Sequence, residues 1–233
     1  MEDKAMLTRT ITALLLALVL GACSALADSF TLADGSTHDG DVSLINGRIE
    51  IGSDCEVKGE ISNVNGRIQI GGGSRALDIS NVNGRIELGE GVAIDGDVSS
   101  VNGRIELGRG SRVTGELESV NGQISADGVE IDGQVSSVNG SIEMRDSRAE
   151  SLVTNNSSIM LDEGAFIAGA LTVRKSQGIN FNAGSPPKIV IGREVTVEGP
   201  LKFERDVELF VHETATVGEI TGAEAVHYSG DEP

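Results

Sequence analysis

The sequence contains no tryptophan and a single tyrosine, and aromatic residues make up only 3% of its 233 residues. Aromatic rings supply large, rigid contact surfaces. Their near absence leaves little on which a sugar could stack, and it disfavours an enzyme that acts on carbohydrates. The low aromatic content and the 31 glycines also argue against a conventional layered core. We therefore expect a more regular architecture.

Positive charge is scarce as well. The chain has 18 Lys and Arg against 36 Asp and Glu, which gives a formal net charge of −18. An excess of negative charge repels phosphate, so we do not expect a nucleic acid as a partner.

The chain also lacks a long apolar run outside its first residues, where "ITALLLALVL" extends from Ile11 to Leu20. Ten apolar residues are too few to span a bilayer. The run follows Lys4 and Arg9 and precedes small residues, which is typical of an export signal. We assign the signal to residues 1–27 and the folded chain to residues 28–233.

The signal contains two candidate cleavage sites. Leu20 to Cys23, "LGAC", resembles a bacterial lipobox, in which Cys23 is lipidated and becomes the mature N-terminus. The alternative is an ordinary signal-peptidase site after Ala27. Ser24 follows the cysteine, which by resemblance to sorting rules in Gram-negative bacteria implies the outer membrane. The expected location is therefore an outer-membrane lipoprotein or a periplasmic or secreted protein.

A repeat of 18 or 19 residues runs through most of the remaining chain. Asn-Gly pairs begin at residues 46, 65, 83, 102, 121 and 139, so successive pairs are separated by 19, 18, 19, 19 and 18 residues. The pairs are Asn46-Gly47, Asn65-Gly66, Asn83-Gly84, Asn102-Gly103, Asn121-Gly122 and Asn139-Gly140. Fixed periods of this length indicate repeat architectures.

Within each repeat, apolar and polar residues alternate as in a strand: Ile86 and Leu88 are apolar, whereas Arg85 and Glu87 are polar. Glycine adopts positive φ at little cost and asparagine tolerates it, so the Asn-Gly pairs predict corners. Stacked corners would also let asparagine side chains bond from coil to coil. We predict an all-β fold: a single-stranded parallel β-helix, or β-solenoid, with about ten coils of 18–19 residues and three short strands per coil.

The repeat is interrupted once and changes character towards its end. The spacing of the glycine markers Gly169 and Gly199 predicts an inserted loop at about residues 176–187. The aromatic residues and charges that follow predict a C-terminal cap at about residues 203–233, because solenoids protect their open strand edges in this way. Cys55 aligns with inward positions, so we expect a buried thiol, with a disulfide-linked dimer as the alternative.

Outward columns of charge are the candidate sites. Arg48, Arg67, Arg85 and Arg104 should form one column, beside a column that contains Glu50, Glu87 and Glu106. We expect these carboxylates to neutralise the arginines, and the alternative is a surface for an anionic partner such as a glycan or phosphate.

Metal and catalytic sites are not expected. The Asp-Gly-Asp turns at Asp39 and Asp95 lack the pattern of calcium-binding rolls, so we expect structural turns there. Solenoid acyltransferases of the hexapeptide-repeat kind rely on a histidine, but His38, His212 and His227 lie near the two ends. We expect no catalytic residue and no cofactor.

The segments "LGEGVAIDGDV" and "LDEGAFIAGAL" resemble the rungs of bactofilins, and "VNGRIEL" resembles adhesin-like β-strand repeats of exported bacterial proteins. The resemblance to bactofilins implies a right-handed β-helix that forms polymers. The export signal and the dense Asn-Gly pairs depart from that family. We therefore expect a non-catalytic structural or adhesive scaffold of the cell envelope whose partners are envelope components or copies of itself. The alternative is a carbohydrate-binding or carbohydrate-active β-helix protein.

Overall fold

A computed structural model describes residues 29–175 and 185–233. The predicted signal in residues 1–27, including Cys23, lies outside the described residues, as does most of the predicted insertion, residues 176–184. No helix long and apolar enough to cross a bilayer occurs within the described ranges.

The described residues form 24 strands and no helix. The strands are β1 (Ser29–Leu32), β2 (Thr37–His38), β3 (Val42–Ile51), β4 (Glu56–Val57), β5 (Ile61–Ile70), β6 (Arg75–Ala76), β7 (Ile79–Leu88), β8 (Ala93–Ile94), β9 (Val98–Leu107), β10 (Arg112–Val113), β11 (Leu117–Asp127), β12 (Glu130–Ile131), β13 (Gln134–Arg145), β14 (Arg148–Ala149), β15 (Ser151–Asp162), β16 (Phe166–Ile167), β17 (Leu171–Val173), β18 (Lys188–Ile191), β19 (Thr196–Val197), β20 (Leu201–Phe203), β21 (Glu208–His212), β22 (Thr216–Val217), β23 (Ile220–Thr221) and β24 (Ala225–Tyr228).

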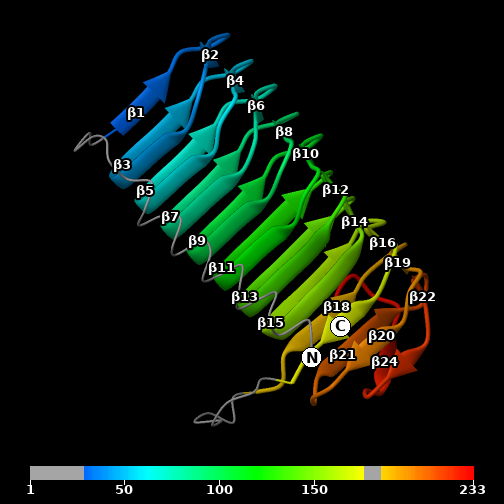
Figure 1. Ribbon diagram of the computed structural model, residues 1–233. Helices are drawn as coiled ribbons and strands as arrows, with labels where there is room; N and C mark the ends of the chain where they lie inside the picture. Colours follow the sequence, from blue (N-terminus) through cyan, green and yellow to red (C-terminus); the bar gives the residue numbers. More distant parts are fainter. Residues whose placement is uncertain (1–28, 176–184) are drawn as a thin grey trace.

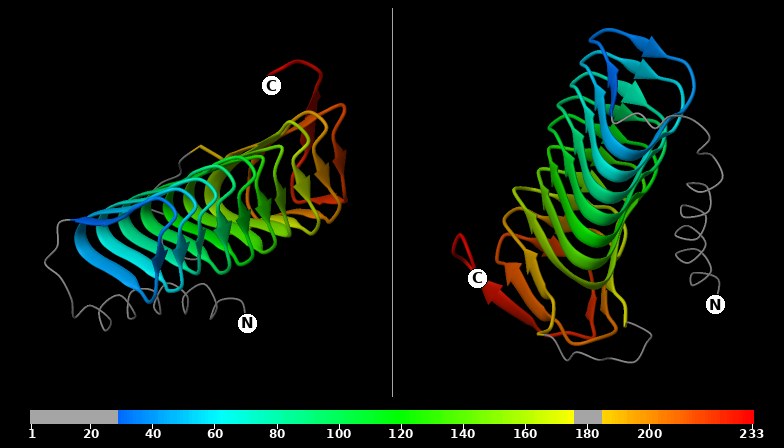
Figure 2. Two further views of the ribbon diagram at one scale, coloured as in Figure 1. Left: turned by 90° about the horizontal axis from the view of Figure 1, so that it is seen from above. Right: turned by 90° about the vertical axis from the view of Figure 1, so that its left-hand side faces the viewer.

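Each strand pairs with the equivalent strand of the next coil, and the pairs are parallel. One sheet runs from β1 through β3, β5 and β7 to β15 and on to the C-terminal strands, and a second sheet contains β2, β4, β6 and their successors up to β22. Figure 1 shows this ladder of strands, and Figure 2 shows that the coils stack into an elongated body. The chain is therefore an all-β parallel β-solenoid of about ten turns, as the repeat predicts.

The number of strands per coil differs from the prediction. In the coils between residues 42 and 162, each coil has one long strand of 10–12 residues and one of two residues, rather than three short strands. The Asn-Gly pair lies inside the long strand, where the backbone bends but keeps its register with the next coil. The C-terminal coils do have three short strands, beginning with β17, β18 and β19.

Glycine is needed at the bend because the coils approach each other closely there. Gly84 has φ +141°, and a Cβ atom on it would lie 1.8 Å from the backbone oxygen of Gly66. No side chain fits at that distance. With the backbone in this conformation, β5 and β7 can therefore keep their close approach only if residue 84 has no side chain. In β15, Ser157 takes the equivalent place, and its φ is not positive.

A second corner follows each long strand, and a residue with positive φ marks it in most coils. Gly91 has φ +66° and Gly110 has φ +76° at this corner, and Asp54 adopts φ 55° at the same place. Glycine adopts this conformation without strain, and aspartate adopts it more readily than most residues. This corner turns the chain into the short strands of the second sheet.

The interior is made of aliphatic columns that run along the stack. One column has exposed fractions of 0–1% and contains the equivalent residue of each successive coil. Its members are Ile49, Ile68, Ile86, Ile105, Ile124, Ile142, Ile159, Ile189 and Leu209. Because each side chain packs on apolar neighbours in the coils above and below, burial is shared between coils, and one coil alone could not be stable.

The two ends of the described stack carry aromatic pairs instead. The rings of Phe30 and His38 meet edge to face in the first coil, with centroids 5.2 Å apart. His212 and Tyr228 meet in the same way near the other end, at 5.0 Å. The segment that we expect to act as a cap, residues 203–233, continues the stack through β21 to β24.

Candidate functional site

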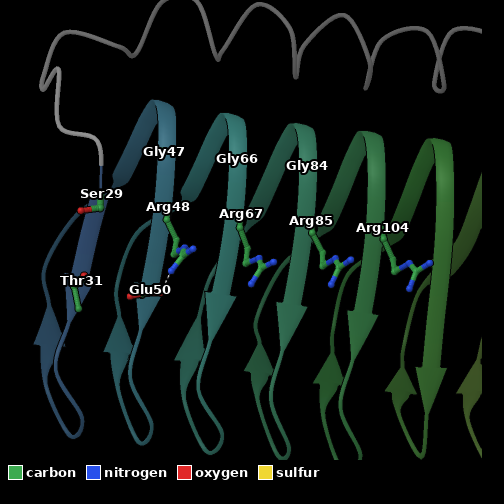
Figure 3. A pocket seen from close by; sticks show the side chains of 10 residues that line it. All are labelled: Ser29, Thr31, Gly47, Arg48, Glu50, Gly66, Arg67, Gly84, Arg85 and Arg104. Carbon is green, nitrogen blue, oxygen red and sulfur yellow. Dashed lines mark hydrogen bonds and ion pairs between the residues drawn. The ribbon is translucent and has the colours of Figure 1, made fainter.

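A groove of about 860 Å³ runs across the outer surface of the first coils. It is lined by Arg48, Arg67, Arg85 and Arg104, one from each of four successive long strands, and by Ser29 and Thr31 of the first coil. Figure 3 shows the four guanidinium groups side by side along the stack. We call this surface the arginine groove. The register of β3, β5, β7 and β9 places these arginines in one column, as the repeat predicts.

Glutamates two residues further along the same strands pair with three of these arginines. The Nη1–Oε1 distances are 2.8 Å for Arg48–Glu50, 2.8 Å for Arg85–Glu87 and 2.9 Å for Arg104–Glu106. The hydrogen bond that Arg85 donates to Glu87 and the negative charges of Glu106 and Glu87 raise the pKa of Arg85. The groove is thus a stripe of alternating charge rather than a bare cationic surface.

Arg67 is the exception. The residue two positions along is Gln69, which carries no charge, and the Nη1 atom of Arg67 lies 3.8 Å from Oε2 of Glu87 on the next coil. Glu87 also accepts a hydrogen bond from Arg85, so one carboxylate serves both arginines. Arg67 therefore has the least neutralised charge in the groove.

The asparagines of the repeat form a continuous ladder beside the groove. Each side-chain Nδ2 donates to Oδ1 of the asparagine one coil earlier, at distances between 2.9 and 3.1 Å. We call this set the asparagine ladder, and its members are Asn46, Asn65, Asn83, Asn102, Asn121 and Asn139. All the amide groups point the same way, so their donors face the N-terminal end and their acceptors face the C-terminal end.

Arg205 lies at the C-terminal side of this ladder. Asn156 follows Asn139 in register, and its Oδ1 accepts a hydrogen bond of 2.6 Å from Nη1 of Arg205. The same nitrogen lies 3.2 Å from the backbone oxygen of Asn155. The positive guanidinium thus lies one coil beyond Asn139, on the side to which the acceptor atoms of the ladder point.

A second polar column, which was not predicted from the sequence, lies inside the solenoid. Its members face inward at the position before the bend, and all are at most 3% exposed. We call it the inner polar column, and it contains Asn63, Asn81, Ser100, Ser119, Ser137 and Thr154. The alternation of Ile61, Ser62 and Asn63 along β5 carries the signal, because residues two apart share a face.

The aspartates of the Asp-Gly-Asp turns are engaged in structural contacts. Asp39 pairs with Lys58 at 3.0 Å, and Asp95 pairs with Arg75 at 2.5 Å. Asp97 Oδ1 accepts a hydrogen bond of 2.7 Å from the backbone N–H of Glu116 on the next coil. Among the described residues, no group of three or more His, Cys, Asp or Glu is placed to hold a metal ion.

His38 lies in β2, in the first coil. His212 and His227 lie in β21 and β24, at the other end of the stack. His38 packs on Phe30, and His212 is 5% exposed and packs on Tyr228. His227 lies on β24, next to Val211 of β21, and none of the three histidines lines the arginine groove.

Comparisons with protein-family models, with curated proteins and with solved structures find no match to this chain. The resemblance to bactofilins and adhesin-like repeats therefore rests on the quoted segments alone.

Proposed function

We propose that this protein is a non-catalytic structural or adhesive scaffold of the bacterial cell envelope. It is exported to the periplasmic or outer-membrane side, and its partners are envelope components or further copies of itself. The proposal concerns residues 28–233 as the working part of the chain, with residues 1–27 as the export signal and Cys23 as the candidate lipid attachment site.

The observation that carries the proposal is the use of polar side chains between coils. In the asparagine ladder, the side-chain amides form hydrogen bonds with the amides of neighbouring coils. The aspartates of the turns and Arg112 of β10 do the same, since Arg112 pairs with Glu130 and Asp132 of the following coil. Side chains held in this way stiffen a rod, because bending it would break bonds in every coil. They are correspondingly less free to rearrange around a substrate.

Electron microscopy of purified residues 28–233 at rising concentration tests the proposal. We expect rods of about 50 Å, since ten coils at about 4.8 Å each give that length. Filaments or lateral bundles at high concentration would identify self-assembly, whereas rods that bind isolated envelopes would identify an envelope partner. A compact globule, or turnover of an envelope polysaccharide, would contradict the proposal.

The export route needs a separate measurement. Palmitate labelling of the full-length chain in a Gram-negative host, with Cys23→Ala as the matched variant, distinguishes the two ends of the signal. Labelling lost in the variant supports a lipid anchor, and a mature chain that begins at Asp28 supports signal-peptidase cleavage after Ala27.

A second candidate function is the binding of an anionic polysaccharide in the arginine groove. The incomplete neutralisation of Arg67 favours it, because a carboxylate of the ligand could provide the partner that Gln69 does not. Retention on immobilised polygalacturonate at low salt tests this candidate. The double variant Arg67→Gln/Arg85→Gln should abolish retention, whereas Arg112→Gln on the other sheet should not. Equal retention of both variants would exclude the groove.

A further inference from the structure

The inner polar column replaces apolar residues in the middle of the solenoid only. The same inward position holds Leu44 in the coil before the column and Val173 and Phe203 in the coils after it. These apolar residues are 7% exposed or less. In the six successive coils between them, this inward position holds an amide or a hydroxyl group in place of an apolar side chain.

Four oxygen atoms of this column have no hydrogen-bond partner among the described residues: Asn63 Oδ1, Asn81 Oδ1, Ser100 Oγ and Ser119 Oγ. Their side chains are 0%, 0%, 2% and 3% exposed, in the same order. They belong to four consecutive coils. The further residues of the column are different, because Ser137 Oγ lies 2.8 Å from Ser157 Oγ.

The two amides show what kind of partner is needed. Nδ2 of Asn63 donates to the backbone oxygen of Gly47 at 3.0 Å, and Nδ2 of Asn81 donates to that of Gly66 at 3.1 Å. These bonds hold the backbone of the bend from inside and set the orientation of both amides. Each Oδ1 therefore points to a place that only a hydrogen-bond donor can satisfy.

A buried polar atom without a partner costs about 1–3 kcal/mol. Four such atoms in adjacent coils would be a large penalty for a solenoid of this size. Buried water is the usual partner of such groups in proteins and typically makes two to four hydrogen bonds. Serine is also smaller than the leucine, valine and phenylalanine at the same position elsewhere, so side chains fill less of the interior beside Ser100 and Ser119.

The spacing of the coils suits water. Neighbouring coils lie about 4.8 Å apart, and a water oxygen forms hydrogen bonds of about 2.8 Å. One molecule between two coils can therefore reach an oxygen on each of them. A water between the two asparagines would donate both its protons, and a water beside a serine would donate or accept.

We propose that a file of bound water runs inside the solenoid from Asn63 to Ser119, with one molecule between each pair of adjacent coils. The ligand is water alone, held by the four unpaired oxygens. The file lets a polar column occupy the core, and through Asn63 and Asn81 it connects to the bends of the long strands. This inference rests on the fold and is independent of the proposed function.

Magnetic relaxation dispersion of residues 28–233, which counts long-lived internal water, tests the proposal in solution. The inner variant is Ser100→Val/Ser119→Val, which introduces the valine found at Val173. The outer variant is Ser99→Ala/Ser136→Ala, which alters the opposite face of β9 and β13 at the positions in register with Glu118. The first should lose about two of the internal waters that bridge adjacent coils, whereas the second should keep the wild-type count.

If the valine variant does not fold, Asn81→Leu provides the same test, because it introduces the residue found at Leu44. Equal water counts in the wild type, the inner variants and the outer variant would overturn the proposal. A crystal structure that resolves ordered water gives the direct check, with one density peak expected between each pair of adjacent coils. Continuous side-chain packing across the column without such peaks would also overturn it.

Discussion

Arg205 bonds to Asn156 across 49 positions of the sequence, with its Nη1 atom 2.6 Å from Oδ1. The arginine lies between β20 and β21, and the asparagine lies in β15. This contact joins the C-terminal coils, which have three short strands, to β15, one coil beyond the asparagine ladder. It places a positive charge at the end where the acceptor atoms of the ladder point.

Arg205→Gln should weaken the attachment of the C-terminal coils. Hydrogen bonds to charged groups contribute about 1.5–3 kcal/mol to stability. The bond between Arg205 and Asn156 is partly exposed, so we expect a loss of unfolding free energy at the lower end of this range. Hydrogen exchange should become faster in β18, β21 and β24 and stay unchanged in β5 and β7. Lys202→Gln makes the same charge change on the exposed face of β20 and is the control. Equal effects of both variants would show that only net charge matters.

Gly84→Ala should prevent the long strands from stacking. The added Cβ would lie 1.8 Å from the backbone oxygen of Gly66, so two coils must separate, and we expect loss of soluble folded protein. Gly164→Ala is the matched control, because it also has positive φ, at 78°, but no atom lies within 4 Å of its Cβ position. Backbone strain alone costs about 1–3 kcal/mol. Thermal unfolding distinguishes the two, and similar unfolding temperatures would contradict the close-approach argument.

Glu118 should make the stability depend on pH. Burial, followed by the charge and hydrogen bond of Glu116, raises the pKa of Glu118 to about 7. The folded state therefore holds its proton more tightly than the unfolded state, whose glutamate carboxyl has its ordinary pKa of about 4.3. Stability is then highest below pH 4–5 for this group, and it falls as the pH rises to about 7.

Glu118→Ser supplies the comparison, since Ser99 and Ser136 occupy the same position on the neighbouring coils. Urea unfolding at pH 5 and pH 8 measures the free energy of unfolding of both proteins. Relative to the wild type, the variant should be more stable at pH 8 than at pH 5, by an amount on the order of 2 kcal/mol. A constant difference between the two proteins across this range would contradict the shifted pKa.

Cys55 should be unreactive while the protein is folded. Its side chain is 3% exposed, and its Sγ lies 3.1 Å from the backbone oxygen of Ala33. Iodoacetamide should label it only as fast as the chain unfolds. Cys55→Val should be tolerated, because Val92 and Val195 fill the same inward column, whereas Cys55→Asp would bury a charge. A disulfide-linked dimer of the folded protein on a non-reducing gel would contradict this burial.

The Asn-Gly period and the alternation of Ile86 and Leu88 with Arg85 and Glu87 are sufficient to predict the solenoid, the burial of Cys55, and the ion pairs along the arginine groove. These features depend on residues that lie at the same place in every coil. One coil therefore predicts its neighbours, and a local pattern becomes a column as soon as the coils stack.

Other features depend on how the coils approach each other in space. The bend of a long strand at Gly84, in place of a corner between short strands, follows from hydrogen bonds that continue across it. The hydrogen bonds from Asn63 into the bend, and the reach of Arg205 to Asn156, require the distances between stacked backbones. The order of residues establishes the period, because each coil must bury the same face. The close approach of the coils at the bend and the contacts between distant coils form only when the coils stack, because they depend on distances that no single repeat contains.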